Sequence, residues 1–505
     1  MPDSAITPSP SRLDRGLPGN TVVRLCALLL VLSFPAIRES SHITAFFNGD
    51  VWWHLQTGLW MLQHHAAPHS GIFSQAANQA WVASNWAADL MLAIAYRVIG
   101  LKSLLAELVF FKSAWAAVAF LVAYAARRRF WTALALCVLA QYSLADTQPL
   151  PIFFSMILFG VVASLLLGVR RTGNLKLLYA LPPIFLLWAN LHLEFVYGLL
   201  ILGLFALTTA LEAGWPQLRS EEWAPASSLP LGLTLAFCAA GAVATLFTPY
   251  GVNLYGQIGS ALFDRVQFAS FTEMAAMEFR SCGNFVVLGL LMTAFLAMGR
   301  RRSRDIFKLA ALAIFAMLAF RIQRDVWAIL LLSICVIAEA DTIRPEAQSG
   351  HEWKPVLGVI GFVLLILPLA LVMRLPDDAT LLRRASSVLP VAACDAIRAQ
   401  HLPAPIYNTY QWGGFLDWYL PEYPVSIDGR ISLWGDAENE TYFKLVGASM
   451  KLEDSPVFMR AGTILLERNS GLAQALTSLP ALRDQYRVAY QDDLAIVVVR
   501  VSATP

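Results

Sequence analysis

Residues 152–171 read IFFSMILFGVVASLLLGVRR, an unbroken apolar run that ends in two arginines. A helix of about 20 such residues is long enough to cross a hydrocarbon core about 30 Å thick. Arginines at the end of a span are typical of its cytoplasmic boundary. The segment therefore predicts a transmembrane helix, and much of the chain repeats its pattern.

The composition supports the same conclusion. Of 505 residues 57% are hydrophobic and only 14% are charged, and the mean hydropathy is +0.57. Soluble domains carry about 25% charged residues. The net charge of +2 gives no basic field, which excludes nucleic acid as an expected partner. The six cysteines form no C-x-x-C pair, so neither a zinc site nor a disulfide framework is expected.

We therefore expect a mostly α, polytopic transmembrane bundle of about 11–13 spans. Residues 1–23 are predicted to be a disordered cytoplasmic tail, 24–375 the transmembrane domain, and 47–85 its first external loop. The candidate spans lie near residues 24–46, 86–100, 103–125, 131–146, 152–169, 177–192, 195–211, 229–247, 284–299, 306–320, 326–340 and 355–373.

Clusters of arginine orient these spans. Arg127–Arg129, Arg170–Arg171 and Arg300–Arg304 all lie at span ends and are predicted to be cytoplasmic. Two full crossings between residues 86 and 125 would place Arg127 on the opposite side. Either one of those two segments is re-entrant or partial, or the arginines break the rule.

A second domain is expected from residue 387 to 505, where the apolar runs shorten. It is predicted to be a small extracytoplasmic α/β domain whose final hairpin turns at Gln491–Asp493. The predicted strands are 405–408, 423–428, 463–467 and 495–500, and the predicted helices are 438–450 and 471–479.

The first external loop holds the strongest local motif, NGDVWWHLQTG at residues 48–58. Asp50 is a candidate general base or acceptor-positioning carboxylate, with Trp53 and His54 beside it as substrate-binding candidates. The alternative is that the tryptophans anchor the chain at the membrane interface and Asp50 is a solvated loop residue. The nearby His64, His65 and His69 have no spaced partners that would favour a metal site.

Other polar residues fall at span ends on the same predicted side. Ionisable groups at a membrane boundary are functional candidates because burying them is costly unless they face a cavity or a partner. Arg321 and Arg324 stand against the positive-inside trend and would suit an anionic partner such as a lipid phosphate, unless Asp325 neutralises them. The remaining candidates are Asp146, Asn190, His192, Glu194 and Tyr250.

The C-terminal domain adds two motifs. Asn408 and Trp412 belong to NTYQWGG at 408–414, which could cradle a polar ligand, and Asp428 and Arg430 belong to IDGR at 427–430. A tight turn with an internal ion pair is the structural alternative for Asp428–Arg430.

Taken together, the motifs D-x-W-W-H, W-x-N-L-H, P-Y-G and the late W-G-G and I-D-G-R resemble bacterial members of the GT-C glycosyltransferase superfamily. That superfamily includes protein O-mannosyltransferases, the aminoarabinose transferase of lipid A and the catalytic subunits of oligosaccharyltransferases. The resemblance maps Asp50 as the catalytic or acceptor-binding acid, Asp146 as a second acidic position, and Arg321 or Arg324 as the ligand of a lipid phosphate. The chain departs from it in lacking an Asp-Glu pair, a D-x-D motif and an H-G-x-F motif.

The resemblance implies a sugar donor linked to polyprenyl phosphate and a glycan, lipid or protein acceptor, used at the outer face of a bacterial inner membrane. No cofactor is certain, and a divalent cation, Mg²⁺ or Mn²⁺, is a possible one. Two other classes of function stay open on sequence grounds: a lipid or polysaccharide transporter or flippase, and a non-catalytic envelope assembly protein.

Overall fold

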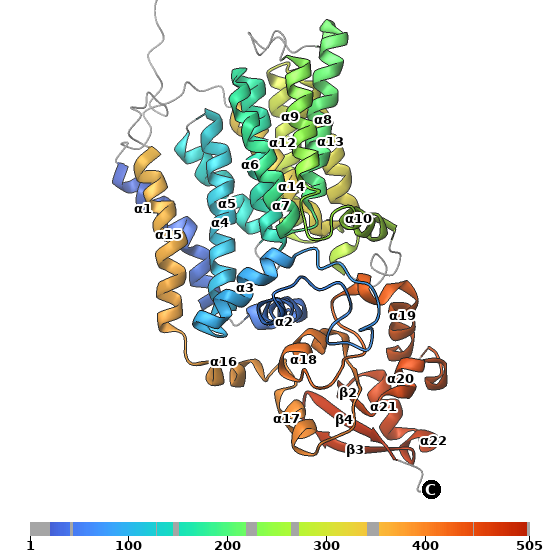
Figure 1. Ribbon diagram of the computed structural model, residues 1–505. Helices are drawn as coiled ribbons and strands as arrows, with labels where there is room; N and C mark the ends of the chain where they lie inside the picture. The colour runs from blue at the N-terminus through green and yellow to red at the C-terminus, as the bar shows by residue number, and fades with distance from the viewer. Residues whose placement is uncertain are drawn as a thin grey trace, which may run out of the picture.

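The computed structural model describes residues 21–40, 44–127, 129–144, 151–218, 230–263, 272–340, 353–447 and 449–501. It consists of a long helical bundle with a smaller mixed domain at one end (Figure 1). This confirms the predicted fold class, a helical bundle followed by a small C-terminal α/β domain.

The helices of the bundle run along its long axis. Six of them are long and apolar enough to cross a membrane among the residues described, namely α1, α4, α6, α8, α12 and α15. The shorter α5, α7, α9, α13 and α14 run beside them (Figure 1). The bounds are α1 Thr21–Ser40, α4 Lys102–Arg127, α5 Phe130–Ser143, α6 Ile152–Thr172, α7 Leu181–Leu191, α8 Phe195–Gly214, α9 Leu231–Ala244, α12 Cys282–Arg300, α13 Ile306–Arg321, α14 Val326–Ala340 and α15 Trp353–Arg374.

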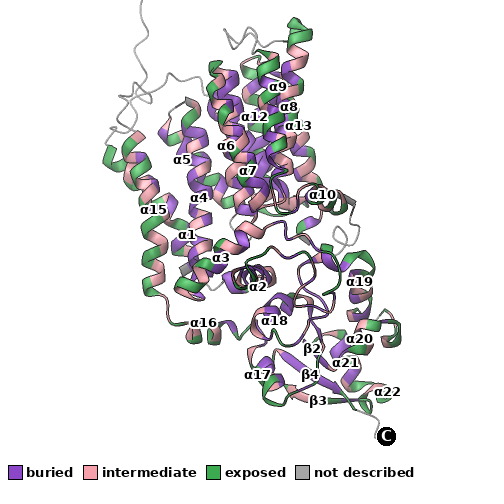
Figure 2. Ribbon diagram, viewed as in Figure 1, coloured by how far each residue is buried: buried purple, intermediate pink, exposed green. Residues whose placement is uncertain are grey.

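Burial follows position in the bundle. Nearly every residue of α14 is buried, so this helix forms the centre, whereas α15 exposes large side chains such as Leu365 and Met373 at the periphery. Figure 2 shows the buried residues along the middle of the bundle and the exposed ones on its outside. Apolar side chains on the outside of a bundle are suited to a lipid solvent.

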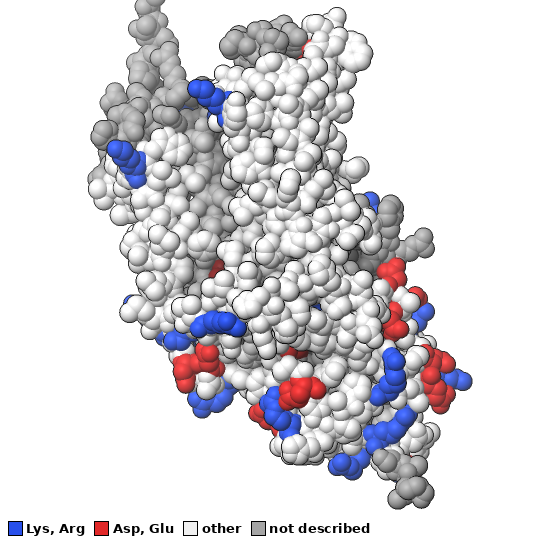
Figure 3. All heavy atoms as spheres, in the orientation of Figure 1, with Lys and Arg blue, Asp and Glu red and all other residues white. Residues whose placement is uncertain are grey.

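On the face visible in Figure 3, charge gathers at the two ends of the bundle. The visible face is almost free of charged residues along its middle, and charges gather around the C-terminal domain (Figure 3). At the opposite end Arg170 lies 2.7 Å from Glu212 and 3.0 Å from Asp305. These buried ions are paired, as ions removed from water must be.

The first loop folds into two helices, α2 (Gly49–His64) and α3 (Trp86–Ile99). Gly58 lets them pack closely, because a Cβ there would lie 2.0 Å from the carbonyl oxygen of Asp89. Helix α3 slants across the end of the bundle beside α2 instead of running alongside α4 (Figure 1). The segment 86–100, predicted as a span, is thus the partial one of the two, and Arg127 and Arg170 come to lie at the same end of the bundle.

The C-terminal domain is built on a four-stranded sheet of order β1-β2-β4-β3. Strand β1 pairs with β2 in parallel, and β4 pairs antiparallel with both β2 and β3. The hairpin predicted at Gln491–Asp493 joins β3 to β4. The bounds are β1 Ile406–Asn408, β2 Thr463–Glu467, β3 Tyr486–Gln491, β4 Ala495–Arg500, α16 Asp378–Ala385, α17 Val391–Ala399, α18 Gly413–Tyr419, α19 Ile431–Val446, α20 Pro456–Arg460, α21 Gly471–Ser478 and α22 Pro480–Arg483.

The predicted strand 423–428 is wrong. It forms no regular strand: Pro424 accepts one hydrogen bond from Ile406 of β1 at 3.2 Å, whereas Val425 pairs with the first loop, accepting from Gln75 at 2.9 Å and donating to the carbonyl of Phe73 at 3.3 Å. The segment thereby joins the C-terminal domain to the first loop. Short connecting elements complete the fold: helix α10 (Asn253–Phe263) and the 3-10 turns at Thr44–Phe46, Leu175–Ala180, Pro216–Leu218, Thr272–Met274, Gln323–Asp325, Tyr410–Trp412 and Leu452–Asp454.

Candidate active site

Asp50 lies in the first turn of α2, at the junction between the bundle and the C-terminal domain. The side chain of Asn48 caps the helix by accepting from the Asp50 amide at 2.7 Å, which orients this first turn. The indole Nε1 of Trp53 donates to Asp50 Oδ1 at 3.1 Å. Gly429 of the C-terminal domain lies against the same oxygen, since a Cβ there would be 1.7 Å from it.

This environment changes the acidity of Asp50. Burial raises its pKa to about 6, and the nearby Glu273 and Asp428 act in the same direction. His54 and the hydrogen bond from Trp53 oppose the rise. A carboxylate with a pKa just below neutral pH is ionised under physiological conditions and is still basic enough to accept a proton.

His54 lies one helical turn beyond Asp50 and makes a buried pair with Asp89 of α3. Its Nδ1 lies 2.6 Å from Asp89 Oδ1, and both side chains are almost fully buried. The carboxylate fixes the orientation of the ring. The other oxygen of Asp89 is buried without a hydrogen-bond partner.

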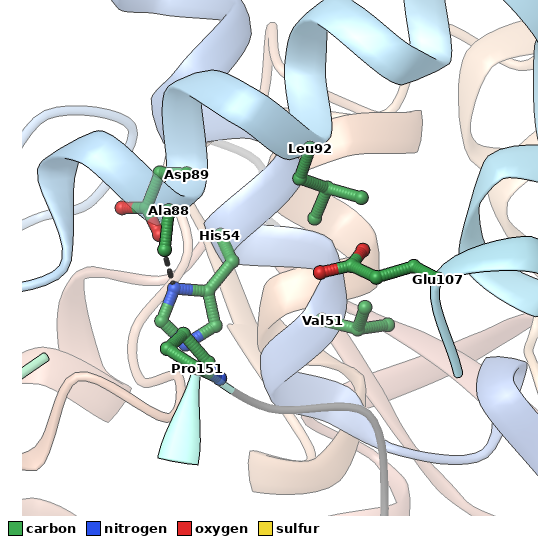
Figure 4. A pocket seen from close by; sticks show the side chains of 7 residues that line it. All are labelled: Val51, His54, Ala88, Asp89, Leu92, Glu107 and Pro151. Carbon is green, nitrogen blue, oxygen red and sulfur yellow. Dashed lines mark hydrogen bonds and ion pairs between the residues drawn. The ribbon is translucent and has the colours of Figure 1, made fainter. Parts of the chain in front are cut away.

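A small cavity adjoins this pair. Figure 4 shows His54 and Asp89 at one side of the cavity and Glu107 of α4 at the other, with its carboxyl group directed into the space between. The remaining walls are Val51, Ala88, Leu92 and Pro151.

The turn between α7 and α8 contributes His192 and Glu194. Ser155 of α6 links this turn to the bundle, because its hydroxyl lies 2.7 Å from His192 Nδ1 and accepts from Trp188 Nε1 at 2.7 Å. Burial and the positive charge of Arg324 hold the pKa of His192 well below its usual value. His192 is therefore neutral near pH 7.

Arg324 lies between several acidic groups. It donates to Glu194 Oε1 at 3.1 Å and lies 3.8 Å from Asp325 and 3.9 Å from Glu273. Burial raises the pKa of Glu194 to about 8; Arg324 opposes the rise, and Asp325 and Glu273 add to it. Arg324 thus faces three carboxyl groups, and burial opposes the ionisation of the one that it contacts most closely.

Asp325 is held from α8, since the hydroxyl of Tyr197 donates to its carboxylate. One oxygen of Asp325 and one of Glu194 are nevertheless buried without hydrogen-bond partners. Arg324 keeps 32% of its side chain exposed. The cluster is thus charged, partly open and incompletely bonded, which suits a polar ligand.

Glu273 connects the two halves of the site electrostatically. Its charge raises the pKa of Asp50 and also that of Glu194. Glu273 also lies 3.9 Å from Arg324, so Asp50 and Arg324 are both within electrostatic reach of this acid, although 274 positions separate them in the chain.

Other candidates from the sequence have their polar groups engaged within the fold. Asn190 accepts from Trp86 at 3.0 Å and donates to the carbonyls of Leu186 and Phe247. The hydroxyl of Tyr250 donates to the carbonyl of Pro68 at 2.8 Å, which fastens the first loop.

The candidates of the C-terminal domain are buried as well. Asn408 bonds to Thr409, Ser426 and Ile427, and Trp412 donates to the carbonyl of Val388 at 3.1 Å. Asp428 and Arg430 form a buried ion pair of 2.6 Å, the internal pair of a tight turn.

Three sets of candidates complete the sequence predictions. Asp146 lies outside the described residues, and Arg321 is exposed at the end of α13. His64 stacks on Trp60 with ring centroids 4.2 Å apart. Within the described ranges, no three His, Cys, Asp or Glu side chains gather closely enough to hold a metal ion.

Four residues of the site were not among those predicted: Asp89, Glu107, Glu273 and Gly429. Asp89 and Glu107 fall within the predicted spans 86–100 and 103–125, and an ionisable residue inside such a run is itself a signal of function. Glu273 carries no local signal, because it is a lone acid in an external segment. Gly429 could be suspected from the turn motif but not from its contact with Asp50.

Comparison with known proteins supports the fold. The archaeal oligosaccharyltransferase AglB from Archaeoglobus fulgidus, solved with an inhibitory peptide and a dolichol-phosphate, superposes with a TM-score of 0.54 over 96% of this chain and 75% of its own, at 9% identity. ArnT from Cupriavidus metallidurans, solved with undecaprenyl phosphate, superposes with a TM-score of 0.50 over 95% of this chain and 98% of its own, at 13% identity. No family model and no curated protein matches the chain.

Both solved structures are GT-C glycosyltransferases, so this chain has a GT-C-like fold, as the sequence motifs predicted. Its apolar helices and this fold together make it an integral membrane protein.

The His54–Asp89 pair gives a first prediction. Replacing Asp89 with Ala should lower the free energy of unfolding by about 2 kcal/mol, because the buried imidazole loses a charge-assisted hydrogen bond. Asp484→Ala is the control, since its pair with Arg483 is exposed and should contribute almost nothing. Thermal unfolding in detergent measures both, and equal stability of the two variants would contradict a structural His54–Asp89 pair.

Proposed function

We propose that this protein is a membrane glycosyltransferase that moves a sugar from a polyprenyl-phosphate donor to an acceptor hydroxyl. The observation that carries the proposal is that Glu273, which lies 3.9 Å from the partly exposed Arg324, also acts through its charge on Asp50 at the same end of the bundle. Transfer from a phosphate-linked sugar needs a base for the acceptor and a cation for the leaving group. This region supplies both.

Asp50 would act as the base. The acceptor oxygen attacks the anomeric carbon while its proton passes to the carboxylate of Asp50, and the bond from that carbon to the phosphate oxygen breaks. Attack opposite the leaving phosphate inverts the anomeric centre. The raised pKa of Asp50 suits this task, because a group with a pKa near the working pH is an effective acceptor of protons.

Arg324 would hold the phosphate of the donor. Negative charge develops on this group as the sugar leaves, and a guanidinium can form two parallel hydrogen bonds to it. The exposed part of the Arg324 side chain gives the phosphate access to the guanidinium. Arg321 lies three residues before Arg324, at the end of α13, and is a second cation for the same role.

The solved structures of similar fold agree with this chemistry, since one contains a dolichol-phosphate and the other undecaprenyl phosphate. On this proposal the arginine-rich end of the bundle is cytoplasmic. The C-terminal domain and the site then face the outside of a bacterial inner membrane.

Asp50→Asn should reduce transfer by about 1000-fold, because the amide cannot accept the proton. The wild-type rate should fall below about pH 6, where protonation of Asp50 removes the base. Incubation of the purified protein with radiolabelled polyprenyl-phosphate sugars measures both effects.

Asp436→Asn is the matched control, since Asp436 is exposed on α19, and it should keep the wild-type rate. Unchanged transfer by Asp50→Asn would exclude Asp50 as the base. Binding of donor without turnover by the wild-type protein would favour a transporter or an assembly protein instead.

Arg324→Met should weaken the binding of polyprenyl phosphate by about 10- to 100-fold, the effect of losing a hydrogen bond between charged groups. Arg398→Met is the control, because that arginine pairs with Glu422 on the exposed surface of the C-terminal domain. A binding titration in lipid nanodiscs measures both, and equal affinity of the two variants would rule out Arg324 as the phosphate ligand.

A further inference from the structure

The C-terminal domain approaches the first turn of α2 through glycines. A Cβ on Gly414 would lie 2.3 Å from the carbonyl oxygen of Gly49, and a Cβ on Gly49 would lie 2.5 Å from that of Gln411. Gly429 approaches Asp50 itself, with the 1.7 Å separation given above. Any side chain at these positions would force the two backbones apart. The contact is therefore a close backbone fit around the start of α2.

Trp53 holds the same oxygen of Asp50, a residue that is only partly buried. Its Nε1 donates to Asp50 Oδ1 at 3.1 Å, and a Cβ on Gly429 would lie 2.7 Å from the same nitrogen. The carboxylate oxygen is thus held between an indole from its own helix and a glycine from the other domain.

The turn that carries Gly429 is itself fixed. Asp428 Oδ1 accepts from the amide of Arg430 at 2.8 Å and from its Nε at 3.0 Å, so the two ends of the turn are joined. Arg430 then reaches the first loop, where its Nη1 donates to the carbonyl of Ile72 at 2.8 Å. Its guanidinium also lies 5.1 Å from the ring of Trp81. The buried arginine therefore fastens the turn to the loop that contains Asp50.

We propose that the C-terminal domain is a clamp on Asp50, in which Gly429 is a positioning residue that fixes the carboxylate and limits its contact with water. The inference rests on the proposed function in that Asp50 is taken as the base. It adds a role for the C-terminal domain, whose docking would complete the site.

The clamp predicts how the acidity of Asp50 responds to mutation. The titratable groups that face Asp50 are His54 on α2, Glu273, and Tyr410 and Asp428 of the C-terminal domain. Burial is the main reason that its pKa lies near 6. Opening the clamp would hydrate the carboxylate and lower that pKa, whereas removing the Trp53 hydrogen bond would raise it.

The test compares Gly429→Ala and Trp53→Phe in the transfer assay across pH. Gly429→Ala should lower kcat by about 100-fold through misplacement of the base, with the KM for the donor little changed. In Gly429→Ala the acidic limb of the pH–rate profile should move to lower pH. In Trp53→Phe the same limb should move to higher pH. Gly256→Ala is the control, because a Cβ at that exposed position meets nothing within 4 Å.

Shifts of the acidic limb in opposite directions in the two variants support the clamp. Acidic limbs at the wild-type pH in both variants, or a wild-type kcat in Gly429→Ala, would overturn it. If Gly429→Ala does not fold, Gly414→Ala takes its place with the same expected shift, because a Cβ there would lie 2.3 Å from the carbonyl oxygen of Gly49.

A second readout needs no substrate and separates the clamp from the proposed function. Because folding raises the pKa of Asp50, the wild type should lose stability relative to Asp50→Asn as pH rises from about 4 to about 6 and should lose no more above that. In the Gly429→Ala background this loss should end at a lower pH. The same loss with and without Gly429→Ala would overturn the clamp, whereas absence of transfer by the wild type would overturn only the proposed function.

Discussion

The structure depends on the close fit between the start of α2 and the C-terminal domain. The capped N-terminus of helix α2 lies against the C-terminal domain, and three glycines allow the two backbones to meet without intervening side chains. Trp52 adds apolar contact on the far side, with ring centroids 5.2 Å from Phe415 and 4.9 Å from Trp418. The fit makes two regions that are more than 350 positions apart in the chain into one surface around Asp50.

Electrostatics explains why the polar residues gather at this end. Acidic groups in a poorly hydrated region are stable only if they are paired or protonated. Arg324 pairs with Glu194 at 3.1 Å, His54 pairs with Asp89 at 2.6 Å, and Asp50 is held by Trp53. The unpartnered oxygens of Asp89, Glu194 and Asp325 mark the places where this compensation is incomplete. Buried acidic groups with unsatisfied oxygens at the end of a helical bundle are typical of a site that binds a ligand.

The sequence was informative where local rules apply. Long apolar runs specify helices whatever their partners, so most of the bundle and the sheet with its final hairpin could be predicted. Asp50, Glu194 and Arg324 could be found because an ionisable group at a membrane boundary is conspicuous. Contacts between distant segments carry no such signal. The path of residues 423–428 and the slant of α3 both depend on packing against the first loop, and Gly429 gains its meaning only from its position beside Asp50.

The central claim is that the first loop and the C-terminal domain are joined in the working protein, and a disulfide tests it most directly. Ser74 and Val425 are paired across this interface. Cysteines placed at both positions, with Cys26 and Cys282 changed to serine, should form a bond on mild oxidation in native membranes, and mass spectrometry of the linked peptides would detect it. We predict that most molecules become linked and keep their affinity for polyprenyl phosphate. Thiols that stay separately reactive towards an alkylating reagent would contradict the account.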